Sequence, residues 1–143
     1  MQIADVLRGK AMGPDVMTTA PSATVGELLA LLSAHNVGAL PVVEAGELVG
    51  IVSERDVVRQ LHERGRDLLD ATVADIMTAD VVVCSPQDRA ADLARVMTER
   101  RIRHLPVCNE RGLVGIVSIG DLVKTRIDEL EREREHLASY INS

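Results

Sequence analysis

The feature that most constrains this sequence is a repeat with an offset of 65 residues. Residues 40–42 (Leu-Pro-Val), residues 48–53 and Asp56 return as residues 105–107, residues 113–118 and Asp121. The offset holds without a gap from Asp15 against Asp80 to Val58 against Val123. Such a duplication indicates two copies of one supersecondary unit, neither of which buries its apolar face alone. We therefore expect the copies to pack together and the functional site to lie where they meet.

Each copy predicts the same order of elements. Residues 25–35 carry apolar side chains at helical spacing after a capping-box pattern, Thr24 with Glu27. Residues 40–43 and 48–52 predict a hairpin, after which Ser53 caps a helix over residues 54–61. The second copy predicts a strand over 81–84, a helix over 89–100, a hairpin over 105–117, and a helix from Asp121 capped by Ser118.

The expected fold class is therefore α/β in the broad sense (α+β), with two β-α-β-β-α units packed as a pseudo-twofold pair. We place the first unit at residues 1–64, the second at 65–130 and a helical tail at 131–143. Residues 3–7 and 73–78 resemble each other, and they predict a short lead-in helix that opens each unit.

Composition narrows the class of protein. Hydrophobic residues make up 46% of the chain but aromatic residues only 1%, so aliphatic side chains must build the core. The net charge of -6 argues against nucleic acid or a membrane surface as a partner, because both require a basic footprint. The first residues lack a signal-peptide pattern, and no apolar run is long enough to span a membrane. We expect a soluble, cytoplasmic protein.

The two cysteines have no counterparts in the other copy. Cys84 stands opposite Thr19, and Cys108 stands opposite Val43, so the repeat does not need a disulfide. A metal site of these thiols with His104 is conceivable, but the chain has no CxxC pair and no carboxylate cluster at ligand spacing. Buried structural thiols are the favoured interpretation, with no metal and no required cofactor.

The tail carries an apolar stripe. Ile127, Leu130, Leu137 and Ile141 follow near-heptad spacing, interrupted by Arg134. This pattern fits either one long solvated helix or a contact with a second subunit, because a narrow apolar stripe on a projecting helix needs cover. The second interpretation predicts a homodimer.

The repeated motif carries the chemistry. It places a glycine in a strand, a serine at the strand-to-helix junction and an aspartate three residues later, as in Gly50, Ser53 and Asp56. An aspartate accepts hydrogen bonds from vicinal hydroxyls, while the serine and the helix N-terminus can hold a hydroxyl or phosphate oxygen. The alternative is purely local, with the serine as N-cap and the aspartate complementing the helix dipole.

Taken together, these motifs resemble the tandem CBS (cystathionine-β-synthase) domain family over nearly the whole chain. The shared elements are Leu-Pro-Val, Gly-hydrophobic-Val-Ser and the later Asp, once per unit. The resemblance implies a stand-alone Bateman-type module without catalytic chemistry. It also implies two cleft sites for adenosine ligands and frequent dimerisation of modules.

The resemblance assigns Asp56 and Asp121 to ribose hydroxyls, and Ser53 and Ser118 to ribose or α-phosphate. It also makes each site composite, with one copy's aspartate facing the other copy's first strand and Leu-Pro-Val entry. Asp56 is then expected to meet Val83, Cys84, Ile102, Arg103, His104 and Pro106. Asp121 is expected to meet Met17, Thr18, Thr19, Val37, Gly38, Ala39 and Pro41. An adenine ring would lie between aliphatic side chains such as Ile102, Val37, Ile51 or Ile116.

The copies differ in charge beside these sites. Residues 100–104 read Arg-Arg-Ile-Arg-His, where the first copy has His-Asn-Val-Gly-Ala. We expect Arg103 and His104 to contact phosphate, with Arg55 as a further contact, and nucleotides to bind more tightly at the Asp56 site. The alternative is a solvated helix end, where basic residues are favoured anyway.

The predicted function is a regulatory sensor of AMP, ADP or ATP without catalytic activity. An effector protein that reads the ligand would be a separate chain, and the sequence does not identify it. Two alternatives stay open: a structural dimerisation or interaction module with empty clefts, and a binder of S-adenosylmethionine or a dinucleotide.

Overall fold

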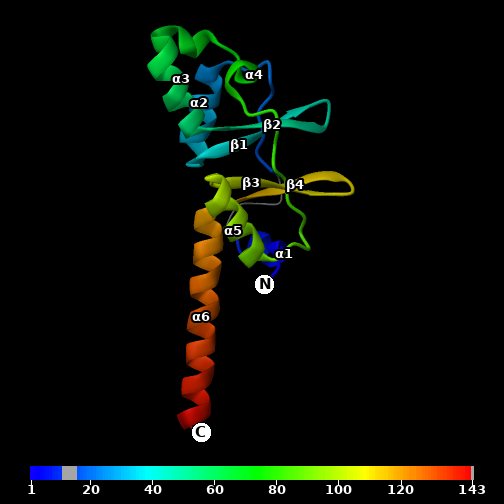
Figure 1. Ribbon diagram of the computed structural model, residues 1–143, viewed down its shortest axis with the longest axis vertical. Helices are drawn as coiled ribbons and strands as arrows, with labels where there is room; N and C mark the ends of the chain where they lie inside the picture. The colour runs from blue at the N-terminus through cyan, green and yellow to red at the C-terminus, as the bar shows by residue number, and fades with distance from the viewer. Residues whose placement is uncertain (11–15, 143) are drawn as a thin grey trace.

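The computed structural model describes residues 1–10 and 16–142, so Asp15, where the repeat begins, lies outside the described residues. The first copy contains α2 (Val25–His35), β1 (Ala39–Glu44), β2 (Glu47–Ser53) and α3 (Glu54–Arg64). The second contains α5 (Ala90–Arg100), β3 (His104–Asn109), β4 (Gly112–Ser118) and α6 (Ile119–Asn142). Outside these lie α1 (Ile3–Arg8), the 3-10 helix η1 (Gly65–Asp70) and α4 (Val73–Ile76). The predicted α+β pair of repeated units is confirmed (Figure 1).

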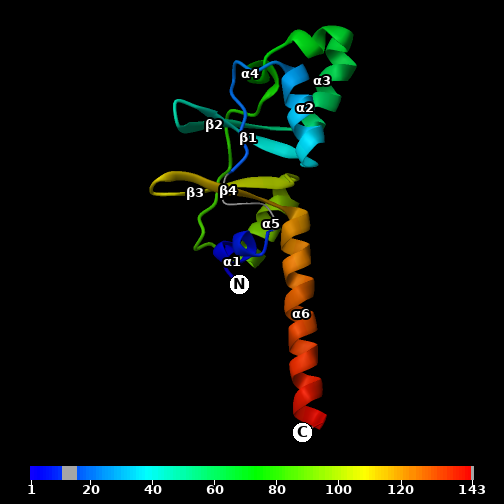
Figure 2. The same cartoon turned by 180° about the vertical axis from the view of Figure 1, so that it is seen from behind.

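Each copy has one antiparallel hairpin, and the two hairpins match residue by residue. Val42 pairs with Gly50 in the first, and Val107 pairs with Gly115 in the second. Ala45 and Gly46 both have positive φ (51° and 80°), as the tight turns that match the right-handed twist of a hairpin require. β2 and β4 contact each other, so the hairpins meet at the centre of the molecule (Figures 1 and 2).

The predicted first strand of each copy is almost absent, which corrects the β-α-β-β-α description. Only Cys84 of the predicted strand 81–84 joins the sheet, through a parallel bridge to Val107. Thr19 makes the equivalent bridge to Val42. Pro21 and Pro86 follow two residues later, and a proline cannot donate to a further ladder hydrogen bond. Each sheet therefore has two full strands with one residue added at its edge.

The structure contains two hydrophobic cores, and the lead-in helices cross between them. α4 contributes Val73 and Ile76 to the core built from α2, β1, β2 and α3. α1 contributes Ile3 and Val6 to the other core, which is built from the second copy. Ile3 N donates to Asp88 O (2.9 Å), as Val73 N donates to Ala23 O (2.8 Å). Each lead-in helix was expected to open one copy but packs in the core of the other: α1 packs in the second core and α4 in the first.

Because of this crossing, the two cores do not follow the order of the chain. The first core comprises α2 to α4, and the second comprises α1 together with residues 84–122.

The glycine in the second strand of each hairpin permits the close approach of the C-terminal end of a lead-in helix. A Cβ at Gly50 would lie 2.6 Å from Met77 Sδ, and one at Gly115 would lie 2.8 Å from Leu7 Cδ2.

The last helix, α6, runs from the body of the second copy away from the rest of the molecule (Figures 1 and 2). Its first turns pack on β4, α5 and α1, and Leu122 is buried there. All side chains over residues 131–142 are exposed. None of the described helices has the length and apolarity that crossing a bilayer demands.

Candidate functional site

The first site residues sit at the junction where β2 ends and α3 begins. Asp56 Oδ2 accepts hydrogen bonds from Ser53 N (2.8 Å) and Ser53 Oγ (3.1 Å). Ser53 Oγ in turn accepts from Asp56 N (3.3 Å), which completes a capping box. The predicted helix cap at Ser53 is therefore confirmed. Within the described residues Asp56 Oδ1 makes no hydrogen bond, so this oxygen is available to a ligand.

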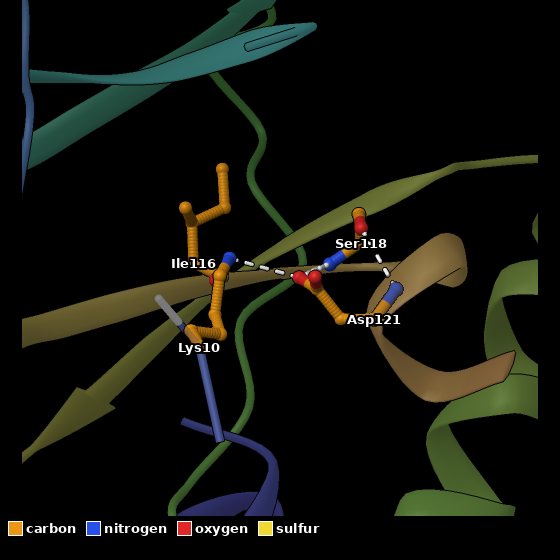
Figure 3. A network of polar contacts seen from close by, with 4 residues as sticks. All are labelled: Lys10, Ile116, Ser118 and Asp121. Atoms are coloured by element: carbon orange, nitrogen blue, oxygen red, sulfur yellow. Dashed lines mark hydrogen bonds and ion pairs between the residues drawn. The ribbon is translucent and has the colours of Figure 1, made fainter. Parts of the chain in front are cut away.

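The second junction, between β4 and α6, repeats the box and adds a cation. Asp121 Oδ2 accepts from Ser118 N (2.9 Å), and Ser118 Oγ accepts from Asp121 N (3.1 Å). Lys10, just after α1, places its Nζ 2.8 Å from Asp121 Oδ2 and 2.8 Å from Ile116 O. Figure 3 shows this network of four residues.

The charge balance at Asp121 follows from these contacts. Partial burial of this carboxyl raises its pKa, but hydrogen bonds from Lys10 and Ser118 and the charge of Lys10 lower it by more. The net result is a pKa below the ordinary aspartate value. Asp121 is therefore an ionised carboxylate at neutral pH, held against an ammonium.

Each serine–aspartate pair lines a cavity with walls from both copies. The Asp121 cavity has a volume of about 560 Å³, and the Asp56 cavity about 370 Å³. The polar and charged lining of the Asp121 cavity includes Arg8, Lys10, Asn36, His104, Ser118, Asp121, Lys124 and Asp128. That of the Asp56 cavity includes Ser53, Glu54, Arg55, Asp56, Arg59, Asp80, Arg101, Arg103 and His104. The prediction that the copies meet at the candidate sites agrees with this geometry.

Many residues expected at the sites line these cavities. Ser53, Arg55, Asp56, Ile102, Arg103 and His104 line the Asp56 cavity, with Gly38, Ala39 and Ile51. Met17, Val37, Gly38, Ala39, Ile116, Ser118 and Asp121 line the Asp121 cavity.

Other expected residues lie elsewhere. Thr19 and Cys84 are buried as the edge bridges of the sheets, and Pro41 and Pro106 are buried within β1 and β3. Thr18 and Val83 point to solvent. The extended chain presents Val16 and Met17 to one cavity, and Val81 and Val82 to the other. The lining segment therefore begins earlier in each copy than expected.

His104 lies between the two cavities and lines both. Its ring approaches Gly38, where an added Cβ would lie 3.4 Å from His104 Cε1. Burial lowers the pKa of His104 below its ordinary value, and Lys10 and Arg103 lower it further, against the opposing effects of Asp121 and Glu54. The imidazole is therefore largely neutral at pH 7.

Sequence reasoning missed Lys10, because it found an evident basic cluster only beside the Asp56 site; Lys10 places a cation at the Asp121 site as well. Lys10 has no counterpart at the 65-residue offset, where Asp75 stands. A signal existed in the spacing: eight residues separate Leu7 from Val16, whereas three separate Met77 from Val81. The longer connection in the first copy carries Lys10 to the cavity of the second copy.

The thiols and acids of the described residues are not grouped as metal ligands. Cys84 and Cys108 are free, and Cys84 Sγ donates to Pro106 O (3.6 Å). Burial, with the nearby charges of Asp88 and Cys108, raises the pKa of Cys84 to about 12, so this thiol is not a nucleophile at neutral pH. Over residues 1–10 and 16–142, no group of three or more His, Cys, Asp or Glu is placed to hold a metal ion.

The fold and the cavities define a class of protein: a tandem α+β module with two clefts, each formed by both copies of the repeat. Comparison with known proteins agrees with this class. The family model for the CBS domain matches residues 3–63 and 73–128, and the chain belongs to the CBS domain family.

Three relatives illustrate the similarity. A mitochondrial CBS domain-containing protein of Arabidopsis thaliana, CBSX3, is 36% identical over 97% of this chain and 71% of its own. The solved CBS-domain protein of Agrobacterium tumefaciens is 39% identical, with a TM-score of 0.83 over 88% of this chain and 99% of that one. The CBS domain pair of protein MJ0100, solved with 5′-methylthioadenosine and S-adenosyl-L-methionine, is 25% identical, with a TM-score of 0.76 over 87% and 98% of the two chains.

Proposed function

We propose that this protein is a regulatory module that binds adenosine nucleotides in the two cavities and has no catalytic activity of its own. The main observation in support of this proposal is that each serine–aspartate pair lines a cavity formed by both copies. A ligand held by one copy's aspartate and the other copy's wall would respond to their relative position. Binding could therefore bias that position if the ligand prefers one arrangement.

The chemistry of the cavities supports a nucleoside. A carboxylate oxygen free of hydrogen bonds from the described residues, as at Asp56, suits vicinal ribose hydroxyls. Ile51 and Ile102 supply aliphatic surface for a base in the Asp56 cavity, and Val37 and Ile116 supply it in the Asp121 cavity. The solved relative that holds two adenosine compounds supports the same ligand class.

A more specific part of the proposal concerns the residues that would contact the phosphate groups of the nucleotide. Arg55, Arg103 and His104 lie together in the Asp56 cavity, as expected for phosphate contacts. A phosphate near the neutral His104 would favour protonation of the ring. AMP, ADP and ATP are the proposed ligands, and S-adenosylmethionine or a dinucleotide is the alternative.

The binding function can be tested by thermal unfolding and calorimetric titration with AMP, ADP, ATP and S-adenosylmethionine. A specific ligand at 100 times its Kd should stabilise the fold by about 2.7 kcal/mol. Asp56→Ala with Asp121→Ala should weaken binding at least tenfold, because a hydrogen bond to a charged group contributes about 1.5–3 kcal/mol. Asp67→Ala removes an exposed carboxyl of η1 and serves as the control. A protein indifferent to all four ligands at millimolar concentration would favour the structural module with empty clefts.

A second proposal concerns self-association through α6. Val123, Ile127, Leu130, Leu137 and Ile141 form a stripe at heptad spacing, and each of these side chains is 47–79% exposed. This α6 stripe extends beyond the body of the molecule (Figure 1). A helix turn with every side chain in water gains little stability by itself, so a partner helix is expected to cover it. A second copy of the chain is the proposed partner, and an effector that reads the ligand would be a further protein.

A further inference from the structure

The two cavities differ most at the aspartate itself. Asp121 is paired with the ammonium of Lys10 at 2.8 Å, and both side chains are mostly buried, with 24% and 19% exposure. Among the described residues no cation lies within ion-pair distance of Asp56. The carboxylate proposed to bind ribose hydroxyls is therefore paired with a lysine, through Oδ2, in the Asp121 cavity but not in the Asp56 cavity.

The two copies differ in the group that donates a hydrogen bond to one backbone carbonyl of the second hairpin strand. In the first copy, the carbonyl of Ile51 accepts a backbone hydrogen bond from Thr78 N (2.9 Å). In the second copy, among the described residues, the equivalent carbonyl of Ile116 accepts from Lys10 Nζ. The donor to Ile116 O that the structure describes is thus a side chain, and it brings a positive charge into the site. Figure 3 shows the ammonium between this carbonyl and the Asp121 carboxylate.

We propose that Lys10 makes the Asp121 cavity selective for nucleosides that carry a phosphate. This inference rests on the proposed nucleoside-binding function and adds a selectivity residue to it. A ribose whose two vicinal hydroxyls engage both carboxylate oxygens of Asp121 must compete with Lys10 for Oδ2, while Oδ1 accepts no hydrogen bond from the described residues. When the ribose displaces Lys10, the lysine ammonium loses its negative partner in a largely buried place. This weakens the binding of any ligand that offers no negative group to the ammonium.

A phosphorylated ligand offers that replacement. The lysine ammonium sits on a flexible four-carbon stem and can turn from the carboxylate to a phosphate within the same cavity. The exchange keeps the cation paired, so the ribose gains Asp121 at little electrostatic cost. Adenosine carries no anionic group and lacks this compensation. The Asp121 cavity should therefore discriminate against adenosine, whereas the Asp56 cavity has no lysine paired with its aspartate.

The test compares AMP with adenosine by calorimetry in an Asp56→Ala background, which confines binding to the Asp121 cavity. With Lys10 present, AMP should bind at least tenfold more tightly than adenosine. Lys10→Met should strengthen adenosine binding several-fold, weaken AMP binding, and reduce the AMP-to-adenosine ratio about tenfold. Lys10→Arg, which keeps the charge, should retain the preference. Arg111→Met, in the β3–β4 turn, makes the same change of net charge far from the cavity and should leave the ratio unchanged.

The outcomes separate this inference from the function on which it rests. A gain in adenosine affinity cannot come from a damaged fold, so it supports the competition directly. An unchanged ratio in Lys10→Met overturns the role of Lys10 and leaves nucleotide binding intact. Loss of AMP binding in the Asp56→Ala protein, with binding retained in the unmodified chain, also overturns it. Absence of binding in the unmodified chain overturns both proposals.

Discussion

At the scale of residues, Asp56 and Asp121 combine a folding task with the proposed binding task. One carboxylate oxygen of each accepts the N–H of the preceding serine and so fixes the strand-to-helix junction. Loss of such a cap costs about 0.5–2 kcal/mol. Any variant at these positions must therefore be measured for stability as well as for affinity, because the two effects share the same atoms.

His104 should make stability depend on pH. Burial lowers its pKa in the folded state, so the unfolded chain binds the proton more readily. The stability linked to the neutral ring is complete above the unfolded value near 6.5 and is lost as the pH falls through the lowered folded pKa. His104→Gln should therefore show a smaller drop in unfolding free energy between pH 7.5 and pH 5.5, as measured by denaturant titration. His62→Gln, at an exposed position of α3, should keep the original drop; equal drops in all three proteins would contradict the assignment.

At the scale of elements, α6 has two parts with different environments. Its first turns pack on the second copy around Leu122, while the side chains over residues 131–142 are exposed. Along the stripe, Lys124 and Arg126 flank the early positions, and Glu131 and Glu133 flank the later ones. An antiparallel partner helix would place these opposite charges beside each other, which favours a pair of α6 helices in that direction.

Substitutions in the α6 stripe should dissociate the proposed dimer. Leu130→Glu with Leu137→Glu removes two exposed apolar side chains per chain, each worth about 1.5–3 kcal/mol when covered. Self-association, measured by sedimentation equilibrium, should weaken at least 100-fold. Arg132→Glu introduces the same acidic group away from the stripe and should weaken it far less. A monomeric unmodified chain at high micromolar concentration would contradict the proposal.

The sequence predicted elements well where local signals were dense. α2, the two hairpins and α3 follow from helical spacing, from the capping serine and threonine and from the glycine turn. The first strands were overestimated, because a short apolar run such as residues 81–84 does not reveal how many of its residues find a partner. The serine–aspartate caps could be predicted from the motif, while ligand binding by these residues stays a prediction. Lys10 could not, since an ion pair across 111 residues depends on the path of a connecting segment.

At the scale of the whole molecule, the crossed lead-in helices tie the two cores together. α1 completes the core of the second copy, although the entire first copy lies between them in the chain. The copies also share both cavities. Because neither core is complete without a distant segment, we expect the two copies to unfold in a single cooperative transition.

Truncation of one side chain near the N-terminus should test this coupling. Ile3 is fully buried in the second core, so Ile3→Ala should cost about 2–5 kcal/mol despite its place beside the chain end. Hydrogen exchange should show a loss of protection in β3 and β4, far away in sequence, and an equal loss in β1 and β2, because the transition is cooperative. Leu69→Ala, at a half-exposed position of η1, should cost less than about 1 kcal/mol and spare these strands. Loss of protection confined to residues 1–10 would show that α1 is dispensable.

The crossed helices also bear on how such a chain could have arisen by gene duplication. A single-copy ancestor of this design would carry a lead-in helix that fits a neighbour's core, because α1 and α4 each complete the other repeat. Such an ancestor would have been an obligate pair of chains that exchanged their helices. Fusion of two genes would then have joined partners that already depended on each other. Afterwards, residues that differ between the copies, such as Lys10 beside Asp121, could distinguish the two sites without disturbing the exchange.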